Sequence, residues 1–281
     1  MKSTGLFTEN LPIALAAECD LEKTIKDLLN MIDYSVKQDT TYKTHDSMWS
    51  KIIKGIDFVD WLYGNHDIEH KDIKRELQIR VSRAETLLGD IDFVSSSNQP
   101  CVFIVGIPSP DFVWTISEYL TFKQNRLKSI KSKSVFSEEL GECFMNIFFD
   151  KSVPGSINTL QTHFDDIREE IVSHLQKLDE FYESFCLCIS KNNSFEETSE
   201  AFKNFSGINC SPQAGRASVK DLKRKYMNTK TKVSEEITCE LHTKFNTHNR
   251  DRSKQDRIYF HPGKPFICDG KIIVIHIGEH L

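Results

Sequence analysis

The segment EITCELHTKF, residues 236–245, decides how the C-terminal part of the chain folds. Successive side chains of an extended chain point to opposite faces, so the residues of this segment separate into two sets. Glu240, His242 and Lys244 share one face, and the other face carries Cys239, Leu241, Thr243 and Phe245. The pattern predicts a β-strand with one buried face and one face that is either solvated or a functional site.

Two further segments of the C-terminal region have the composition of strands. They are DRIYFH (256–261) and KIIVIHIGEHL (271–281), separated by a turn region rich in Pro and Gly. With a two-residue period, Arg257, Tyr259 and His261 share a face of the first segment, and His276 interrupts an otherwise apolar run in the second. We therefore expect one face of a small antiparallel sheet to collect His242, Lys244, Arg257, Tyr259, His261 and either His276 or His280.

A basic helix is expected ahead of these strands. SVKDLKRKYM (218–227) carries four cations at spacings that a helix can present together, namely Lys220, Lys223, Arg224 and Lys225. Packed on the sheet, they and His261 would form a surface that follows a nucleic-acid backbone. SGINCSPQAGRAS (206–218) has the composition of a connector, so we place a domain boundary near residue 207 and expect residues 207–281 to form a basic, β-rich, nuclease-like domain.

Residues 1–206 are predicted to be mainly helical with a few strands. Apolar positions at helical spacing, or helix-start signals, predict helices over 20–36, 46–64, 73–88, 111–127, 156–185 and 194–205. Ser194 and Glu197 have the spacing of a capping box. Short apolar runs predict strands over 101–107 and 142–150. The expected fold class is therefore α+β, in two domains, 1–206 and 207–281.

Composition and charge limit the choice of environment and partners. The 281-residue chain is 39% hydrophobic and has no apolar run of bilayer length, so we expect a cytoplasmic protein with no membrane contact. Its eight cysteines include no Cys-x-x-Cys pair, which argues against zinc. Residues 215–281 contain 14 Lys and Arg against 8 Asp and Glu, a net of +6; since the whole chain carries −5, residues 1–214 carry −11. The basic end is expected to meet a polyanion, and the acidic helical region a protein partner or another copy of the chain.

The polar face of the expected sheet suits RNA cleavage without a metal or other cofactor. Such cleavage needs a base for the 2′-hydroxyl proton, an acid for the leaving oxygen, and cations for the phosphate charge. His242 and His276 can transfer protons, Tyr259 can donate a hydrogen bond, and Lys244 and Arg257 can hold the phosphate. These five residues are the candidate catalytic set.

The sequence RIYF, followed after a turn by GKIIVIHIGEHL, resembles the C-terminal hairpin of RelE-like toxins, the ribonucleases of toxin–antitoxin modules. The resemblance covers about 65 C-terminal residues. It implies phosphate-binding and acid/base roles for Lys244, Arg257 and Tyr259, with His242 or His276 as proton carrier. The chain departs from that family in its ELHTK strand and in some 200 preceding residues. By analogy, a helical module on a nuclease-like domain is similar to prokaryotic toxin and defence proteins.

Two alternatives remain open at the level of sequence. In one, the protein binds nucleic acid and a protein partner without catalysis. In the other, it is a metal-dependent nuclease centred on Glu240 and Lys244, which would require a second carboxylate, such as that of Asp256, to converge on Glu240.

Overall fold

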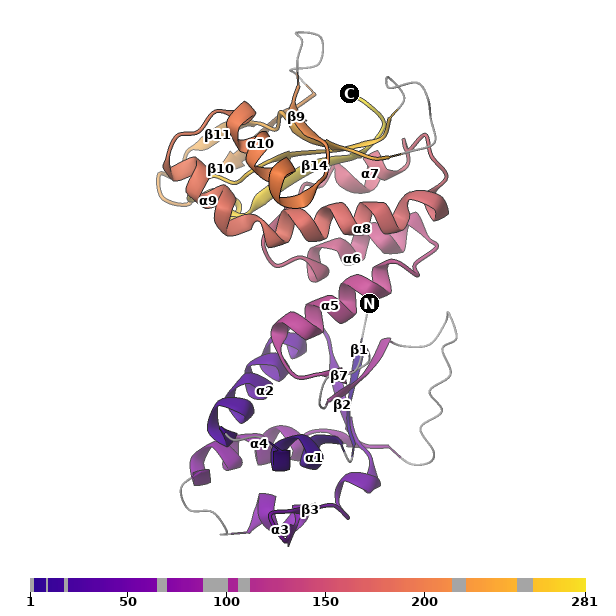
Figure 1. Ribbon diagram of the computed structural model, residues 1–281, viewed down its shortest axis with the longest axis vertical. Helices are drawn as coiled ribbons and strands as arrows, with labels where there is room; N and C mark the ends of the chain where they lie inside the picture. The colour runs from indigo at the N-terminus through magenta and orange to yellow at the C-terminus, as the bar shows by residue number, and fades with distance from the viewer. Residues whose placement is uncertain are drawn as a thin grey trace. The chain divides into compact units, whose positions relative to one another are not determined.

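The computed structural model describes residues 3–8, 10–17, 20–64, 70–87, 101–105, 112–213, 221–246 and 255–281. The chain divides into two compact units, Met1–Arg126 and Leu127–Leu281. Figure 1 shows each unit with its own helices and strands. The boundary predicted near residue 207 differs from this division and lies inside the second unit, because the sheet of that unit takes a strand from residues 147–149.

The first unit is built on a parallel sheet with strand order β5-β2-β1-β6-β7. Its strands are β1 (Ser3–Phe7), β2 (Thr41–Thr44), β5 (Glu85–Thr86), β6 (Cys101–Val105) and β7 (Phe112–Val113). The connections and the end of the unit supply α1 (Asn10–Ala17), α2 (Leu21–Val36), α3 (Phe58–Tyr63), α4 (Lys71–Ser82) and α5 (Ile116–Leu127). The sequence pattern predicts α2, α4, α5 and β6 but no strands at β1 and β2.

The helix expected over residues 46–64 is wrong. This segment contains a 3-10 turn (Asp46–Met48), a hairpin of β3 (Ile52–Ile53) and β4 (Ile56–Asp57), and the short α3. Lys54 and Gly55 lie between the paired residues Ile53 and Ile56, and both have positive φ, 50° and 81°. Two positive φ angles in a two-residue loop produce a hairpin turn, which ends any helix there.

The second unit places helices against one face of a mixed sheet with order β8-β14-β13-β12-β9. Only the β8–β14 pair is parallel among the described pairs of this sheet. Its strands are β8 (Ile147–Phe149), β9 (Cys210–Pro212), β12 (Leu241–Lys244), β13 (Arg257–His261) and β14 (Ile272–Gly278). The helices are α6 (Lys133–Cys143), α7 (Val153–Ile157), α8 (Phe164–Glu180), α9 (Tyr182–Ser190) and α10 (Phe195–Ser206), and a separate hairpin is made by β10 (Lys223–Met227) and β11 (Ser234–Thr238).

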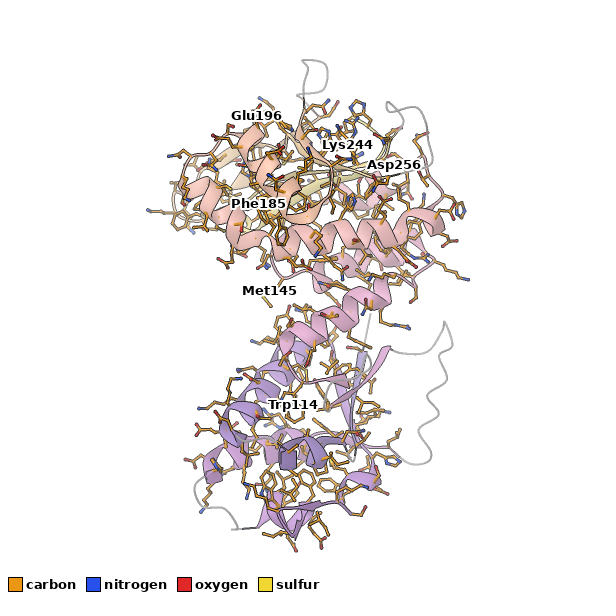
Figure 2. All side chains as sticks on the ribbon, in the orientation of Figure 1. Trp114, Met145, Phe185, Glu196, Lys244 and Asp256 are labelled. Carbon is orange, nitrogen blue, oxygen red and sulfur yellow. The ribbon has the colours of Figure 1, made fainter. Side chains whose placement is uncertain are left out.

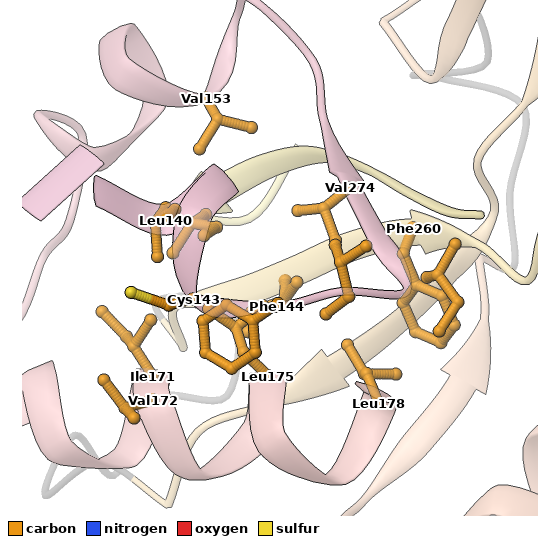
Figure 3. Close-up of a cluster of buried hydrophobic side chains, with 14 of the residues drawn as sticks. Leu140, Cys143, Phe144, Val153, Ile171, Val172, Leu175, Leu178, Phe260 and Val274 are labelled. Atoms are coloured by element: carbon orange, nitrogen blue, oxygen red, sulfur yellow. The ribbon is translucent and has the colours of Figure 1, made fainter. Parts of the chain in front are cut away.

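The core of the second unit lies between α8 and the sheet. Figure 3 shows Ile171, Leu175 and Leu178 of α8 gathered with Phe144, Val274 and other buried apolar side chains. Residues at every second position of the strands, such as Leu241, Ile258 and Phe260, belong to the same cluster. The apolar strand face is therefore buried against helices, as the two-residue period predicts. The other face carries polar side chains and also Tyr259, Ile273 and Ile275, which form a second buried cluster of this unit with Ile237 of β11.

Three predicted elements of the second unit need correction. The α+β class is confirmed. The basic helix predicted over 218–227 is wrong, because residues 223–227 form β10, which pairs with β11. Residues 218–220 lie outside the described part. The strand predicted over 236–245 divides into β11 and β12, which lie in different sheets. The long helix expected over 156–185 is α7, α8 and α9 separated by turns. The capping box is confirmed, because Ser194 and Glu197 bond reciprocally at the start of α10.

No helix in the part of the chain that the structure describes has the length and apolar character needed to cross a bilayer.

Candidate functional site

The strand register aligns four polar side chains in one row across the sheet. Ser211 of β9 is opposite His242 of β12, His242 is opposite Tyr259 of β13, and Tyr259 is opposite His276 of β14. Directly opposed residues of antiparallel strands share a face of the sheet. We call Ser211, His242, Tyr259 and His276 the polar row. The polar row lies on the face of the sheet opposite to the face that packs on α8.

The next register position adds two cations to the polar row. Lys244 of β12 is opposite Arg257 of β13. Figure 2 labels Lys244 near Asp256, the residue before Arg257, at the same end of the sheet. All five predicted catalytic residues therefore lie on β12, β13 and β14, and four of them are buried: His242, Arg257, Tyr259 and His276.

His242 is a buried, uncharged proton acceptor. Only 2% of the residue is exposed. Its Nε2 lies 3.3 Å from Nη1 of Arg257 and 3.3 Å from Oγ of Ser211, and its Nδ1 lies 3.4 Å from the carbonyl oxygen of Glu240. A guanidinium can only donate and a carbonyl can only accept, so the proton is on Nδ1 and Nε2 has the lone pair. Burial, together with the charge of Arg257, lowers the pKa of His242 to about 3.

The hydroxyl of Tyr259 is fully occupied by neighbours. It accepts from Nη1 of Arg257 and from the backbone N–H of Leu281, both at 3.3 Å, and it lies 3.5 Å from the side-chain oxygen of Gln213, to which it can donate. Burial raises the pKa of Tyr259, so the phenol stays protonated at neutral pH. The ring is fully buried and lies 5.0 Å from the imidazole of His242, between ring centroids.

Arg257 is a buried cation without an acidic partner among the described residues. It is 8% exposed, and no residue in the described part of the chain accepts a hydrogen bond from its Nε. Its contacts are the neutral His242 and Tyr259, and among the residues that the structure describes no carboxylate pairs with it. A guanidinium keeps its charge inside a protein, and a buried charge without a counter-charge is costly. This position therefore favours an anionic group.

His276 completes the row but is tied to the segment that follows β14. Its Nε2 lies 2.8 Å from the carbonyl oxygen of Glu279, so this nitrogen donates a proton to the backbone. Burial lowers its pKa. Because Nε2 is used in this way, His242 is the better proton carrier.

The residues predicted to contact nucleic acid do not form one surface. Lys223 pairs with Glu236 at 2.6 Å, and Arg224 lies beside the buried carboxylate of Asp150, with Nε at 3.5 Å. Lys225 is exposed on β10, and Lys220 lies outside the described residues. His261 ends β13, away from the row, where its Nδ1 accepts from the backbone N–H of Gly263; burial lowers its pKa to about 4. Because residues 223–227 form a strand, Arg224 lies on the opposite face of β10 from Lys223 and Lys225.

Two residues of the site, Ser211 in the row and Gln213 beside it, were not predicted from the sequence. Ser211 and Gln213 belong to the segment that the sequence analysis assigned to a connector. β9 has three residues and includes Pro212, so it lacks an alternating pattern. Only the strand pairing reveals that Ser211 is next to His242.

The metal-dependent alternative gains no support from Asp256. The carboxylate of Asp256 accepts from the backbone N–H groups of Gln161 and Thr162, both at 2.9 Å, and therefore does not converge on Glu240. In the described part of the chain, no group of three or more His, Cys, Asp or Glu side chains could hold a metal ion.

Two cavities of the described structure lie away from the row. One, of about 520 Å³, is in the second unit between α9 and the loop 264–270, and another, of about 710 Å³, lies beside α4 in the first unit.

No protein-family model matches the chain, and neither the curated proteins nor the solved structures contain a match.

Proposed function

We propose that the second unit cleaves RNA without a metal ion and that the polar row, with Lys244 and Arg257, is its catalytic centre. The observation that carries the proposal is the position of Arg257: a buried guanidinium, whose Nε–H has no acceptor among the described residues, lies next to the lone pair of a neutral imidazole. A phosphate group would supply the missing counter-charge, and His242 would be ready to accept a proton from a hydroxyl beside that phosphate.

Each side chain is assigned the role in cleavage that its chemistry suits. Arg257 and Lys244 bind the phosphate and stabilise the charge that develops on it. His242 accepts the proton of the attacking hydroxyl and returns it to the leaving oxygen; its low pKa favours the return of the proton and opposes its acceptance. Tyr259 holds Nη1 of Arg257 in position. The wider setting that we propose is a cytoplasmic toxin or defence protein whose other region binds a partner.

A second candidate function is nucleic-acid or protein binding without cleavage. It is favoured by the burial of His242 and by the complete hydrogen bonding of Tyr259, both of which are typical of a structural polar network. Such a protein would hold an anion at Arg257 without any proton transfer.

Labelled RNA, incubated with purified full-length protein in EDTA, tests the proposal. We expect cleavage that His242→Gln reduces by about 10²-fold to 10⁴-fold, the usual range for loss of an acid/base group. His174→Gln is the matched control, because His174 is also a buried histidine but lies on the helix side of β12, 3.0 Å from Thr243. RNA binding without cleavage would establish the second candidate. Cleavage that EDTA abolishes would point to a metal centre and reject the proposal.

A further inference from the structure

Ser211 has the surroundings of an activated nucleophile. Its Oγ lies 3.3 Å from Nε2 of His242, and the other ring nitrogen of His242 is oriented by the carbonyl oxygen of Glu240 at 3.4 Å. A hydroxyl, a base and a group that orients the base form the arrangement that activates serine in unrelated enzymes, and such contacts are often loose before substrate binds.

The position of Ser211 in the sheet makes it accessible. β9 is the last strand of the order β8-β14-β13-β12-β9, and Ser211 is partly exposed on it, whereas His242 is buried behind it. A substrate can therefore approach the hydroxyl from the edge of the sheet. The guanidinium of Arg257 contacts the same imidazole nitrogen, and within the described structure its Nε–H has no acceptor. This charge selects an anionic reacting group over a neutral ester or amide.

We propose that Ser211 is the nucleophile of the polar row and attacks a phosphodiester, so that the substrate needs no 2′-hydroxyl. The inference rests on the proposed function in one respect, namely that this row acts on phosphodiesters. It replaces the substrate's own hydroxyl by a hydroxyl of the protein, and it extends the substrate class from RNA to phosphodiesters in general.

The reaction balances without an added oxidant, reductant or metal. As the bond from Oγ to phosphorus forms, the hydroxyl proton passes to Nε2 of His242. The bond from phosphorus to the leaving oxygen then breaks, and that oxygen takes the proton from His242. The product is a phosphoserine diester and a strand with a free hydroxyl. Water next attacks phosphorus; its proton passes through His242 to Oγ, which regenerates Ser211.

The substrate also removes an obstacle to the first step. The charge of Arg257 is one of the causes that keep the pKa of His242 low. A phosphate oxygen bound to Arg257 offsets that charge, so the imidazole becomes a stronger base when the substrate is in place. Ser211 then reacts only beside an anion, which protects it from unproductive chemistry.

Two oligonucleotides of one sequence, one RNA and one entirely 2′-deoxy, provide the test. Each is incubated with wild-type protein, Ser211→Ala and Ser190→Ala in EDTA, and acid-quenched samples are analysed by mass spectrometry. Ser190 is the control, since its hydroxyl donates to the Leu187 carbonyl within α9, a helix that contributes no residue to the polar row. We expect wild type and Ser190→Ala to cleave both oligonucleotides and to carry a nucleotide on the peptide that contains Ser211. Ser211→Ala should lose about 10³-fold or more of the cleavage.

The outcomes separate this inference from the proposed function. RNA cleavage without 2′-deoxy cleavage would overturn the role of Ser211 and leave the ribonuclease in place. Cleavage of the 2′-deoxy strand by Ser211→Ala would also overturn it. If neither strand is cleaved, both proposals fail. Thermal melts that agree between Ser211→Ala and wild type establish that the variant is folded.

Discussion

Acidification should destabilise the second unit, because its buried histidines are held neutral. Burial lowers the pKa of His174 to about 4, and burial with the charge of Arg257 lowers that of His242 to about 3. Unfolded histidines titrate near 6.5. As the pH falls below about 6.5, the unfolded chain takes up protons that the folded chain does not, so stability is present above that pH and is lost progressively down to about 4.

The size of the effect follows from the number of protons. Each histidine costs about 1.4 kcal/mol per pH unit in this interval, so lowering the pH from 6.5 to 5 costs at most about 2 kcal/mol per histidine and about 4 kcal/mol for His174 and His242 together. Typical domains have about 5–15 kcal/mol of stability in total. The carboxylate of Asp150, whose pKa is lowered mainly by its bonds to Ser152 and Tyr226 against the opposing effect of burial, titrates below this interval.

Urea unfolding at pH 7.5 and pH 5 measures the effect. Trp49, Trp61 and Trp114 are the only tryptophans and all lie in the first unit, so their fluorescence follows that unit and circular dichroism is needed for the second. His174→Gln should reduce the pH dependence by about 2 kcal/mol, even though the substitution itself destabilises. An unfolding free energy of the second unit that is equal at the two pH values would refute the reasoning.

Substitutions at three positions test the packing around the row by thermal unfolding. Tyr259→Phe leaves Nη1 of Arg257 without one acceptor and should cost about 1–3 kcal/mol; an unchanged melting temperature would show that the hydroxyl is not needed. Gly278→Ala places a Cβ against the Ser156 carbonyl oxygen and should lower the melting temperature by several degrees, about 2–4 °C per kcal/mol; the reasoning fails if the variant is as stable as wild type. Asp256→Asn keeps one acceptor for the backbone N–H of Gln161 and should cost less than Asp256→Ala, and equal losses would contradict the contact.

The two-residue period explains why so much of the site was predictable. Alternation alone places His242, Arg257 and Tyr259 on one face and Leu241 and Phe260 on the other, and the structure confirms this separation. The period says nothing about where a strand changes sheets. Thr238 and Leu241 belong to one alternating run, yet they lie in β11 and β12 of different sheets, because the chain leaves one partner strand for another between them.

Other elements could not be predicted because their cause is not local. β10 is rich in Lys and Arg, which suit a helix as well as a strand, and its pairing with the acidic β11 decides the outcome. β1 is short and contains Gly5, which local propensity disfavours in a strand, but its neighbours β2 and β6 pair with it on both sides. Gly5 is required there because a Cβ would overlap the ring of Tyr42.

The proline in β9 has a consequence for solubility. The last strand of a sheet presents unpaired backbone groups that can recruit a strand from another molecule. β9 is short, and Pro212 has no N–H to offer to such a strand. The edge of the sheet can therefore stay accessible at Ser211 while pairing with a strand of a second chain is disfavoured. Access for a substrate and resistance to edge-to-edge aggregation are thus combined in one three-residue strand.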